Sequence, residues 1–401
     1  MTLKIKYSMV LSKKSILYVL LYIFVLSCIL FPADFHHIKK LSFVALMLLG
    51  LDRIVACIGY YRYRIVFFIG IVFPVGTILH SILLGSNISN AVLDGYTGIF
   101  FLLMILICEF DIDYENILKK SLKILCYITL LLVILDLLGI ADVNSSNAIR
   151  NFIYDNNIGF IGKSSEYAAY YKVFIKTSPL LIVLLYDSFE KKRWIDVAAS
   201  FLALNLSGTR ANIFVSFGLL FAMIFLVETN TDKQKRIKFF AIVVTLFLGI
   251  LFTPRVIKYA SNMMFTAGSI ASDAVRSGQI KGLIEALRSP FELIFGAGYG
   301  NVLIYDYGRG VESIEFEWAY FSLLRKVGLI WFTAYMVFLV KPLFKRIKLS
   351  TKVLHIGYMA ITFTNPLLYS STAMILFLYT YILIDEIYNK PSMPMIEKGT
   401  N

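Results

Sequence analysis

Apolar stretches of about twenty residues, separated by short basic segments, recur along this chain and restrict its fold more than any other feature. Hydrophobic residues make up 58% of the 401 residues and charged residues only 16%, so a soluble fold could not cover its apolar surface with polar groups. We therefore predict an all-α polytopic integral membrane protein with about twelve transmembrane helices, forming a single membrane domain over residues 1–401. The predicted spans are residues 15–31, 41–59, 65–84, 93–109, 122–140, 178–189, 195–208, 212–228, 239–253, 317–340, 351–369 and 372–388.

Basic residues are distributed unevenly among the segments that join these spans. If the N-terminus is cytoplasmic, the cytoplasmic segments contain YYRYR, EKKRW, DKQKRIK and KPLFKRIKLSTK, whereas the short segments on the other side carry only Lys39, Lys40 and Arg210. Lys and Arg collect on the cytoplasmic side of membrane proteins, so we predict a multi-pass protein with both termini cytoplasmic. Topology then explains the net charge of +13, and nucleic-acid binding is not expected.

Two of the predicted outward-facing segments are long, residues 141–177 and residues 254–316. Long segments of this kind are usually functional or disordered, and the composition of these two does not suggest disorder. In the second, the sequence GQIKGLIEALR has apolar residues at helical spacing, and Pro290 and several glycines follow it. We predict a short folded element that lies on the membrane surface.

The sequence LSGTRAN, at residues 206–212, places Arg210 at the start of a span, directly after a turn of small residues. A helix N-terminus adds backbone N–H donors to the guanidinium, and this combination binds anions. Charged residues at the edge of the membrane are costly and are therefore candidates for function. The alternative is that Arg210 only anchors the helix end at the interface, which does not account for the small-residue turn.

The second long segment contributes further cations and a group of glycines. SDAVRSG carries Asp273 and Arg276, and Arg288 follows before FGAGYGN. The GxGxG pattern at residues 296–300 resembles a dinucleotide fingerprint, but it follows no strand of a βαβ unit. We interpret it as a tight turn or a close approach of the backbone to a bound group, with Tyr299 among the substrate-binding residues. Both arginines could instead be solvated charges.

The sequence VESIEFEWAYFSLLRKVGLIWF, at residues 311–332, combines carboxylates with buried cations. Glu315 and Glu317 precede a span, and the Arg325–Lys326 pair lies two turns inside it. Helical spacing would place Glu317 above Arg325 on one face. A partly desolvated carboxylate has a raised pKa and can act as a general base. The alternative is that the two glutamates only balance the helix N-terminus.

The first long segment contains weaker candidates. Arg150 and Lys163 lie among tyrosines, a mixture that suits the rings and phosphate oxygens of a sugar phosphate. Asp111-x-Asp113 has the form used by many metal-dependent glycosyltransferases, but the predicted topology puts it on the cytoplasmic face as a solvated loop. The four cysteines have no CxxC spacing and the histidines are scattered, so we expect neither a metal site nor a cofactor.

Taken in order, these motifs resemble those of a known family. The order is SGTRAN, a long segment with D-x-x-R and FGxGxG, and a span that opens E-W-x-Y-x-x-L-L-R-x-x-G-L. This combination resembles the O-antigen polymerase (Wzy) family and the related O-antigen ligases, over roughly residues 140–345. The resemblance implies a GT-C-like helical membrane fold and a metal-independent, inverting glycosyltransferase at the periplasmic face of the bacterial inner (plasma) membrane. Its partners would be undecaprenyl-pyrophosphate-linked glycans, membrane lipids and a separate chain-length regulator.

The resemblance also implies residue roles. Displacing undecaprenyl pyrophosphate without a metal requires cations at the leaving group, and we assign Arg210 and Arg276 to it, with Arg288 and Arg325 in support. Glu317 is the preferred base for the attacking sugar hydroxyl, with Glu315 as the alternative. Arg150, Lys163 and Tyr299 complete the predicted substrate-binding set. Ligase-like sequences carry a His where this chain has Glu317, which favours a polymerase over a ligase.

One rival from a different class is a flippase or transporter for lipid-linked oligosaccharides, which would also need many spans and cations at membrane depth. The two long outward segments and the clustering of charges on one face count against it, because a transporter lines a path across the membrane. The second rival, an O-antigen ligase, differs from the polymerase in its acceptor. The sequence does not identify the sugars, the linkage or the oligomeric state.

Overall fold

The computed structural model describes residues 2–33, 35–138, 148–162, 172–207, 209–226, 267–300, 304–307, 310–313 and 316–389, with single residues between 232 and 243. Helices form most of this part of the chain. The helices that overlap the predicted spans are α1 (Thr2–Leu30), α2 (Ile38–Ala56), α3 (Arg64–Phe67), η3 (Phe68–Val72), α4 (Phe73–Leu83), α5 (Ile88–Gly95), η4 (Tyr96–Leu102), α6 (Leu103–Glu109), α7 (Tyr114–Leu137), η6 (Ser178–Leu180), α9 (Leu181–Glu190), α10 (Trp194–Leu206), α11 (Arg210–Leu226), α15 (Ala319–Val340), α16 (Leu349–Thr362) and α17 (Ser371–Asn389).

Helices occupy eleven of the twelve predicted spans, and the predicted span 239–253 lies almost entirely outside the described residues. By length and composition, four helical segments are able to cross a membrane, and three shorter apolar helices accompany them. The described chain is therefore a mostly helical membrane protein, while the count of twelve spans stays a prediction. The four long segments are Lys13–Leu30, Tyr61–Leu83, Ile88–Glu109 and Ala319–Phe344.

Aromatic side chains fill the centre of the helix bundle. Phe101, Phe338 and Tyr381 bring η4, α15 and α17 together, with ring centroids 4.9–5.2 Å apart. On the outside, Leu83 of α4 and Ile330 of α15 are exposed, as expected for helices that face lipid rather than water. Large aromatic residues thus occupy the centre of the bundle, while its outer surface exposes aliphatic residues together with aromatic ones such as Phe217 and Phe221 of α11.

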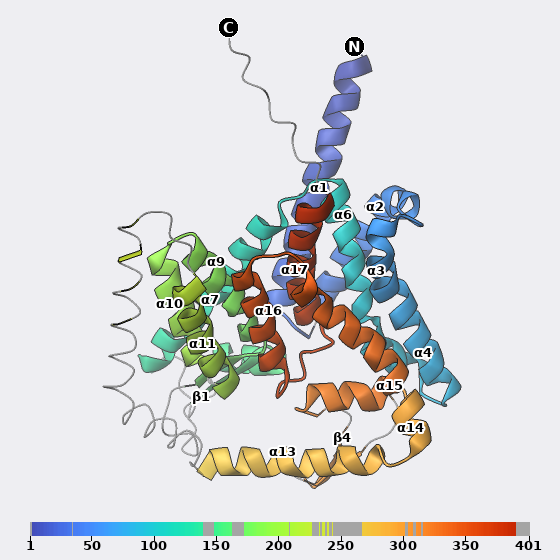
Figure 1. The fold of residues 1–401 in the computed structure, drawn as a ribbon, viewed down its shortest axis with the longest axis vertical. Coiled ribbons are helices and arrows are strands. Elements are labelled where there is room, and N and C mark those ends of the chain that lie inside the picture. Colours follow the sequence, from blue (N-terminus) through green and yellow to red (C-terminus); the bar gives the residue numbers. More distant parts are fainter. Residues whose placement is uncertain are drawn as a thin grey trace.

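The described parts of the two long segments form helices and hairpins, and residues of the first, such as Val173 and Ile175, join the core of the bundle. The first forms α8 (Ala148–Asp155) and a hairpin of β1 (Gly159–Gly162) and β2 (Lys172–Ile175). The second forms α13 (Ala267–Ala286) and α14 (Pro290–Phe295), followed by a second hairpin. Figure 1 shows α13 lying across the lower end of the bundle. The predicted folded element is therefore present, as a longer helix than the sequence indicated, and the two hairpins are an addition to the predicted all-α fold.

Where the structure describes them, the basic segments YYRYR, EKKRW and KPLFKRIKLSTK, predicted to be cytoplasmic, lie at the opposite end of the bundle. There α1 begins and α17 ends, away from α13 (Figure 1). Ion pairs join these segments to one another: Lys13 contacts Asp52 at 3.0 Å, and Lys348 contacts Glu190 at 3.2 Å. Lys191 also bridges α7 and α9 through Glu115 and Asp187. The two ends of the molecule therefore carry different sets of charged residues.

The glycines at 296–300 make a close backbone contact with α15. The N–H groups of Ala297 and Gly298 donate to the carbonyls of Arg325 and Lys326 at 2.8 and 2.9 Å. α15 is interrupted at Gly328, whose φ of 75° frees these carbonyls from the helix. The predicted tight turn is confirmed, and the group that its backbone approaches is α15 itself.

Candidate functional site

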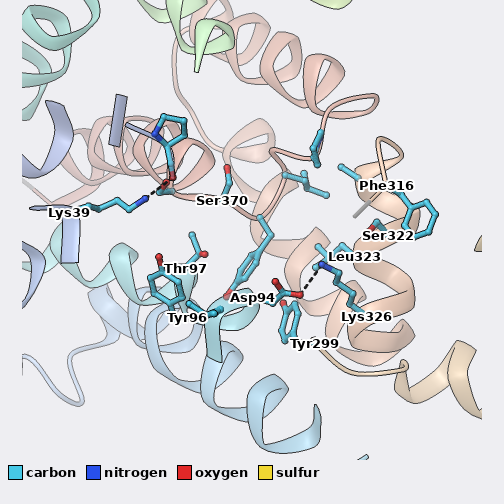
Figure 2. Close-up of a pocket in the computed structure, with 17 residues that line it drawn as sticks. Lys39, Asp94, Tyr96, Thr97, Tyr299, Phe316, Ser322, Leu323, Lys326 and Ser370 are labelled. Atoms are coloured by element: carbon cyan, nitrogen blue, oxygen red, sulfur yellow. Dashed lines mark hydrogen bonds and ion pairs between the residues drawn. The ribbon is translucent and has the colours of Figure 1, made fainter. Parts of the chain in front are cut away.

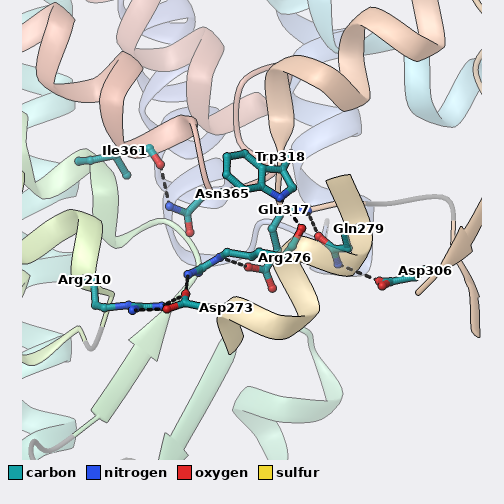
Figure 3. A network of polar contacts seen from close by, with 9 residues as sticks. All are labelled: Arg210, Asp273, Arg276, Gln279, Asp306, Glu317, Trp318, Ile361 and Asn365. Atoms are coloured by element: carbon teal, nitrogen blue, oxygen red, sulfur yellow. Dashed lines mark hydrogen bonds and ion pairs between the residues drawn. The ribbon is translucent and has the colours of Figure 1, made fainter. Parts of the chain in front are cut away.

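Arg210 begins α11 at the lower end of the bundle. The turn before it is held by Asn212, which is fully buried and donates to the hydroxyls of Ser178 and Ser207 at 3.0 and 2.8 Å. The small residues of LSGTRAN therefore have a packing role, which the sequence interpretation did not foresee. The guanidinium of Arg210 forms a two-pronged ion pair with Asp273 of α13, with N–O distances of 2.6 and 3.2 Å (Figure 3).

Arg276, one turn further along α13, joins two carboxylates. Its Nη1 donates to Asp273 Oδ1 at 3.2 Å, and its Nε donates to Glu317 Oε2 at 2.8 Å (Figure 3). The hydrogen bond from Arg210, supported by Arg276, holds the pKa of Asp273 below its ordinary value. We call Arg210, Asp273, Arg276 and Glu317 the ionic network.

Two buried residues hold Glu317 in place. The Gln279 side chain accepts a hydrogen bond from the Glu317 N–H at 3.0 Å and donates to Asp306 Oδ2 at 2.8 Å, and both Gln279 and Asp306 are 0% exposed. Asp306 ends β3 (Ile304–Asp306), which pairs in an antiparallel hairpin with β4 (Val311–Ser313). The indole N–H of Trp318 also donates to the Arg276 carbonyl at 2.8 Å. α13 thereby positions the chain that leads into α15.

The ionic network is accessible and charge-balanced. The side chains of Arg210, Arg276 and Glu317 keep 20, 24 and 27% of their surface exposed, so a ligand can reach them. Two guanidiniums face two carboxylates, and each guanidinium can exchange a carboxylate for a phosphate in the same planar geometry. An incoming anion with several negative charges can therefore replace the carboxylates at the two guanidiniums, and each guanidinium then still has an anionic partner.

A polar cavity of about 240 Å³ lies beside the network (Figure 2). Lys326 of α15 pairs with Asp94 of α5 at 3.1 Å there, and the N–H of Gly300 donates to the same carboxylate at 3.3 Å. Phe316 lines the cavity, and Glu317 next to it belongs to the ionic network. The cavity and the network are therefore neighbours on the two sides of the chain that enters α15.

The structure brings together three of the predicted site residues, Arg210, Arg276 and Glu317. Tyr299 is buried, lines the cavity rather than the network, and has its pKa raised by burial. Arg288 is exposed just after α13, and Arg150 lies on α8, which packs beside β1.

The predicted pairing of Glu317 with Arg325 is wrong. α15 begins at Ala319, so Glu317 lies ahead of the helix, and its carboxylate turns to Arg276 on α13. Arg325 is 1% exposed and interacts electrostatically with Glu292 of α14. The prediction from helical spacing was wrong because the sequence does not show at which residue the first turn of α15 begins. The other two predicted residues, Lys163 and Glu315, lie outside the described residues.

Three polar residues of this region were missed by the sequence interpretation. Asp94 is a single carboxylate at the start of an apolar stretch, and this position could have marked it as a candidate functional residue. Gln279 and Asp306 become partners only through the packing of α13 on the β3–β4 hairpin, and nothing local in the sequence marks them. Within the described residues, no group of three or more His, Cys, Asp and Glu side chains is arranged to hold a metal ion.

Comparison with known proteins leaves the family open. No protein-family model matches the chain, and no curated protein sequence matches it. The class that the fold and the site support is therefore a helical membrane protein with an accessible Arg–carboxylate network at one end of its bundle.

Proposed function

We propose that this protein polymerises oligosaccharide repeat units carried on undecaprenyl pyrophosphate, to form O-antigen or a related surface polysaccharide. The reaction would be an inverting glycosyl transfer at the periplasmic face of the bacterial inner membrane. The observation that carries the proposal is the convergence of Arg210, Arg276 and Glu317, from elements far apart in the sequence, in one exposed network. The same three residues are those that the family resemblance marks for the leaving group and the base.

The proposed chemistry uses the network in two ways. The acceptor hydroxyl attacks the anomeric carbon of the donor, and the bond from that carbon to the pyrophosphate oxygen breaks, with its electron pair leaving on the pyrophosphate. Arg210 and Arg276 stabilise the developing negative charge through two-pronged hydrogen bonds. Glu317 takes the proton of the attacking hydroxyl.

The ion pairs suggest an order of events. Arg276 donates to the carboxylate of Glu317 at 2.8 Å. An arriving pyrophosphate competes for this guanidinium, because phosphate oxygens bind arginine in the same geometry. The carboxylate is then released to accept a hydrogen bond from the acceptor hydroxyl. Donor binding would thus make the base available only when a leaving group is in place.

Deletion of the gene, followed by gel analysis of lipopolysaccharide or capsule, tests the function. We expect lipid A–core carrying a single repeat unit, with the ladder of longer chains lost, and restoration of the ladder by the gene on a plasmid. Bare core would contradict the polymerase. In that case the lipid-linked pool decides between the rivals, since long polymers there indicate a ligase and single units held in the cytoplasm indicate a flippase.

A further inference from the structure

The polar cavity between α2, α5, η4 and α15 is separate from the ionic network and has a composition of its own. Lys39 of α2 is 3% exposed and donates to the Pro32 carbonyl at 2.9 Å. Lys326 lines the opposite side and pairs with Asp94 (Figure 2). The lining residues therefore include two ammonium groups and one carboxylate, and the cavity carries an excess of positive charge.

The remaining lining suits a carbohydrate. The cavity contains aromatic rings, whose faces pack against sugar rings, and hydroxyl groups, which exchange hydrogen bonds with sugar hydroxyls in either direction. Tyr299 and Tyr369 stack with ring centroids 6.0 Å apart, so two of these rings lie beside each other in the lining. The residues that provide rings and hydroxyls include Tyr96, Thr97, Tyr299, Ser322, Tyr369 and Ser370.

The size of the cavity limits the ligand. Its volume of about 240 Å³ is below the roughly 300–1,000 Å³ of sites for drug-sized molecules. One sugar ring with one substituent fits this space, and an oligosaccharide chain does not.

We propose that this cavity binds a single sugar ring bearing an anionic group, with Lys39 as the contact of the anion and the Lys326–Asp94 pair on the opposite side as hydrogen-bond partners of the ring hydroxyls. Two sources have this chemistry: the phosphate-linked end of a glycan on its lipid carrier, and an acidic sugar within the glycan. The proposal goes beyond the polymerase function, because it assigns a second ligand site to residues that the ionic network does not include.

Binding to the full-length protein in lipid nanodiscs tests the proposal. The probes are glucose 1-phosphate, glucuronate and neutral glucose, and binding is followed by calorimetry or by the shift in melting temperature. We expect at least one anionic probe to bind more tightly than glucose. Lys39→Gln should weaken that binding about tenfold, the loss typical of one charge-assisted hydrogen bond. The matched control is Lys40→Gln, a neighbour outside the cavity lining, which should bind as the natural protein does.

Each outcome bears on the proposal. Binding of glucose 1-phosphate alone identifies the phosphate-linked end as the source, and binding of glucuronate alone identifies an acidic sugar. The absence of binding by both, or equal binding of neutral glucose, overturns the site. The double variant Asp94→Asn/Lys326→Gln removes both charges of this partly buried pair together, so that neither is left uncompensated, and it should also lose binding. No step depends on polymer formation, so a failure here is distinct from a failure of the proposed polymerase function.

Discussion

Glu317 is the proposed general base, and its carboxylate accepts a hydrogen bond from Arg276 in the ionic network. Glu317→Gln keeps the size of the side chain and one oxygen acceptor for Arg276, but it removes the group that takes a proton. We expect polymer to be lost, because a general base contributes about 10²–10⁴-fold to rate, while the protein still folds. Gel analysis of the polysaccharide together with the amount of protein in the membrane measures this.

The matched control is Glu285→Gln. Glu285 lies on α13 and accepts a hydrogen bond from Tyr307 at 2.8 Å, but it is outside the ionic network. We expect normal chain lengths in this variant. Normal chain lengths in Glu317→Gln as well would rule out Glu317 as the base.

Asp273 makes the stability of the network dependent on pH. Its pKa is lowered in the folded protein by Arg210 and Arg276, so its stabilising contribution is fully present above the ordinary value of 3.8 and is lost as the pH falls through the lower folded value. We expect Asp273→Asn to unfold at a lower temperature than the natural protein at pH 7. Because the aspartate is half exposed, the difference should stay below about 1 kcal/mol.

Melting curves recorded from pH 7 to pH 3 check this prediction. The difference between the two proteins should begin to shrink below about pH 4, where Asp273 becomes protonated in the unfolded state, and should vanish only below its lowered folded-state pKa, where it is protonated in both states. A difference that stays constant down to pH 3 would show that the carboxylate charge contributes nothing.

The contact between α14 and α15 depends on two glycines. A Cβ at Gly328 would lie 2.2 Å from the Phe295 carbonyl carbon and 2.4 Å from the Gly296 nitrogen, and the φ of 75° and ψ of 170° suit glycine alone. We therefore expect Gly328→Ala to destabilise the protein by more than the roughly 1–3 kcal/mol of backbone strain. The variant should also lose activity, because it displaces Lys326 and the segment leading to Glu317.

The control for Gly328→Ala is Gly218→Ala in α11, where a Cβ would meet nothing within 4 Å. Alanine is favoured over glycine in a helix by about 1 kcal/mol, so this variant should melt at the same or a higher temperature. Thermal unfolding in detergent, measured for both variants in parallel, distinguishes the contact from a general effect of added methyl groups. Equal melting temperatures for the two variants would contradict the role of Gly328.

Sequence reasoning was strongest for elements and weaker for contacts. Hydropathy located helices such as α2 and α7 because a segment that crosses lipid must be apolar along its length. Arg210 was conspicuous as a charge at the start of an apolar run, whereas Arg276 was singled out in the second long segment, as part of the D-x-x-R motif that carries the family resemblance. The Gln279–Asp306 hydrogen bond could not be predicted from the sequence, because it depends on how α13 packs against the β3–β4 hairpin. The start of α15 was misplaced, and this moved Glu317 away from Arg325.

The whole molecule has two charged ends, and their orientation in the membrane decides where any chemistry takes place. Arg288 follows α13 at one end, and Lys192 lies between α9 and α10 at the other, and both are exposed. The positive-inside rule predicts that Lys192 faces the cytoplasm and Arg288 the periplasm. Single cysteines can report this, because Cys28, Cys57 and Cys126 are buried and only Cys108 is partly accessible.

With Cys108 replaced by Ser, we expect Arg288→Cys to react with a membrane-impermeant maleimide in cells whose outer barrier alone has been opened. Lys192→Cys should react only after the inner membrane is broken. Labelling in the opposite order would place the ionic network in the cytoplasm, where lipid-linked repeat units have not yet been exported. That result would exclude the proposed polymerase without any assay of activity, because enzyme and substrate would then lie on different sides of the membrane.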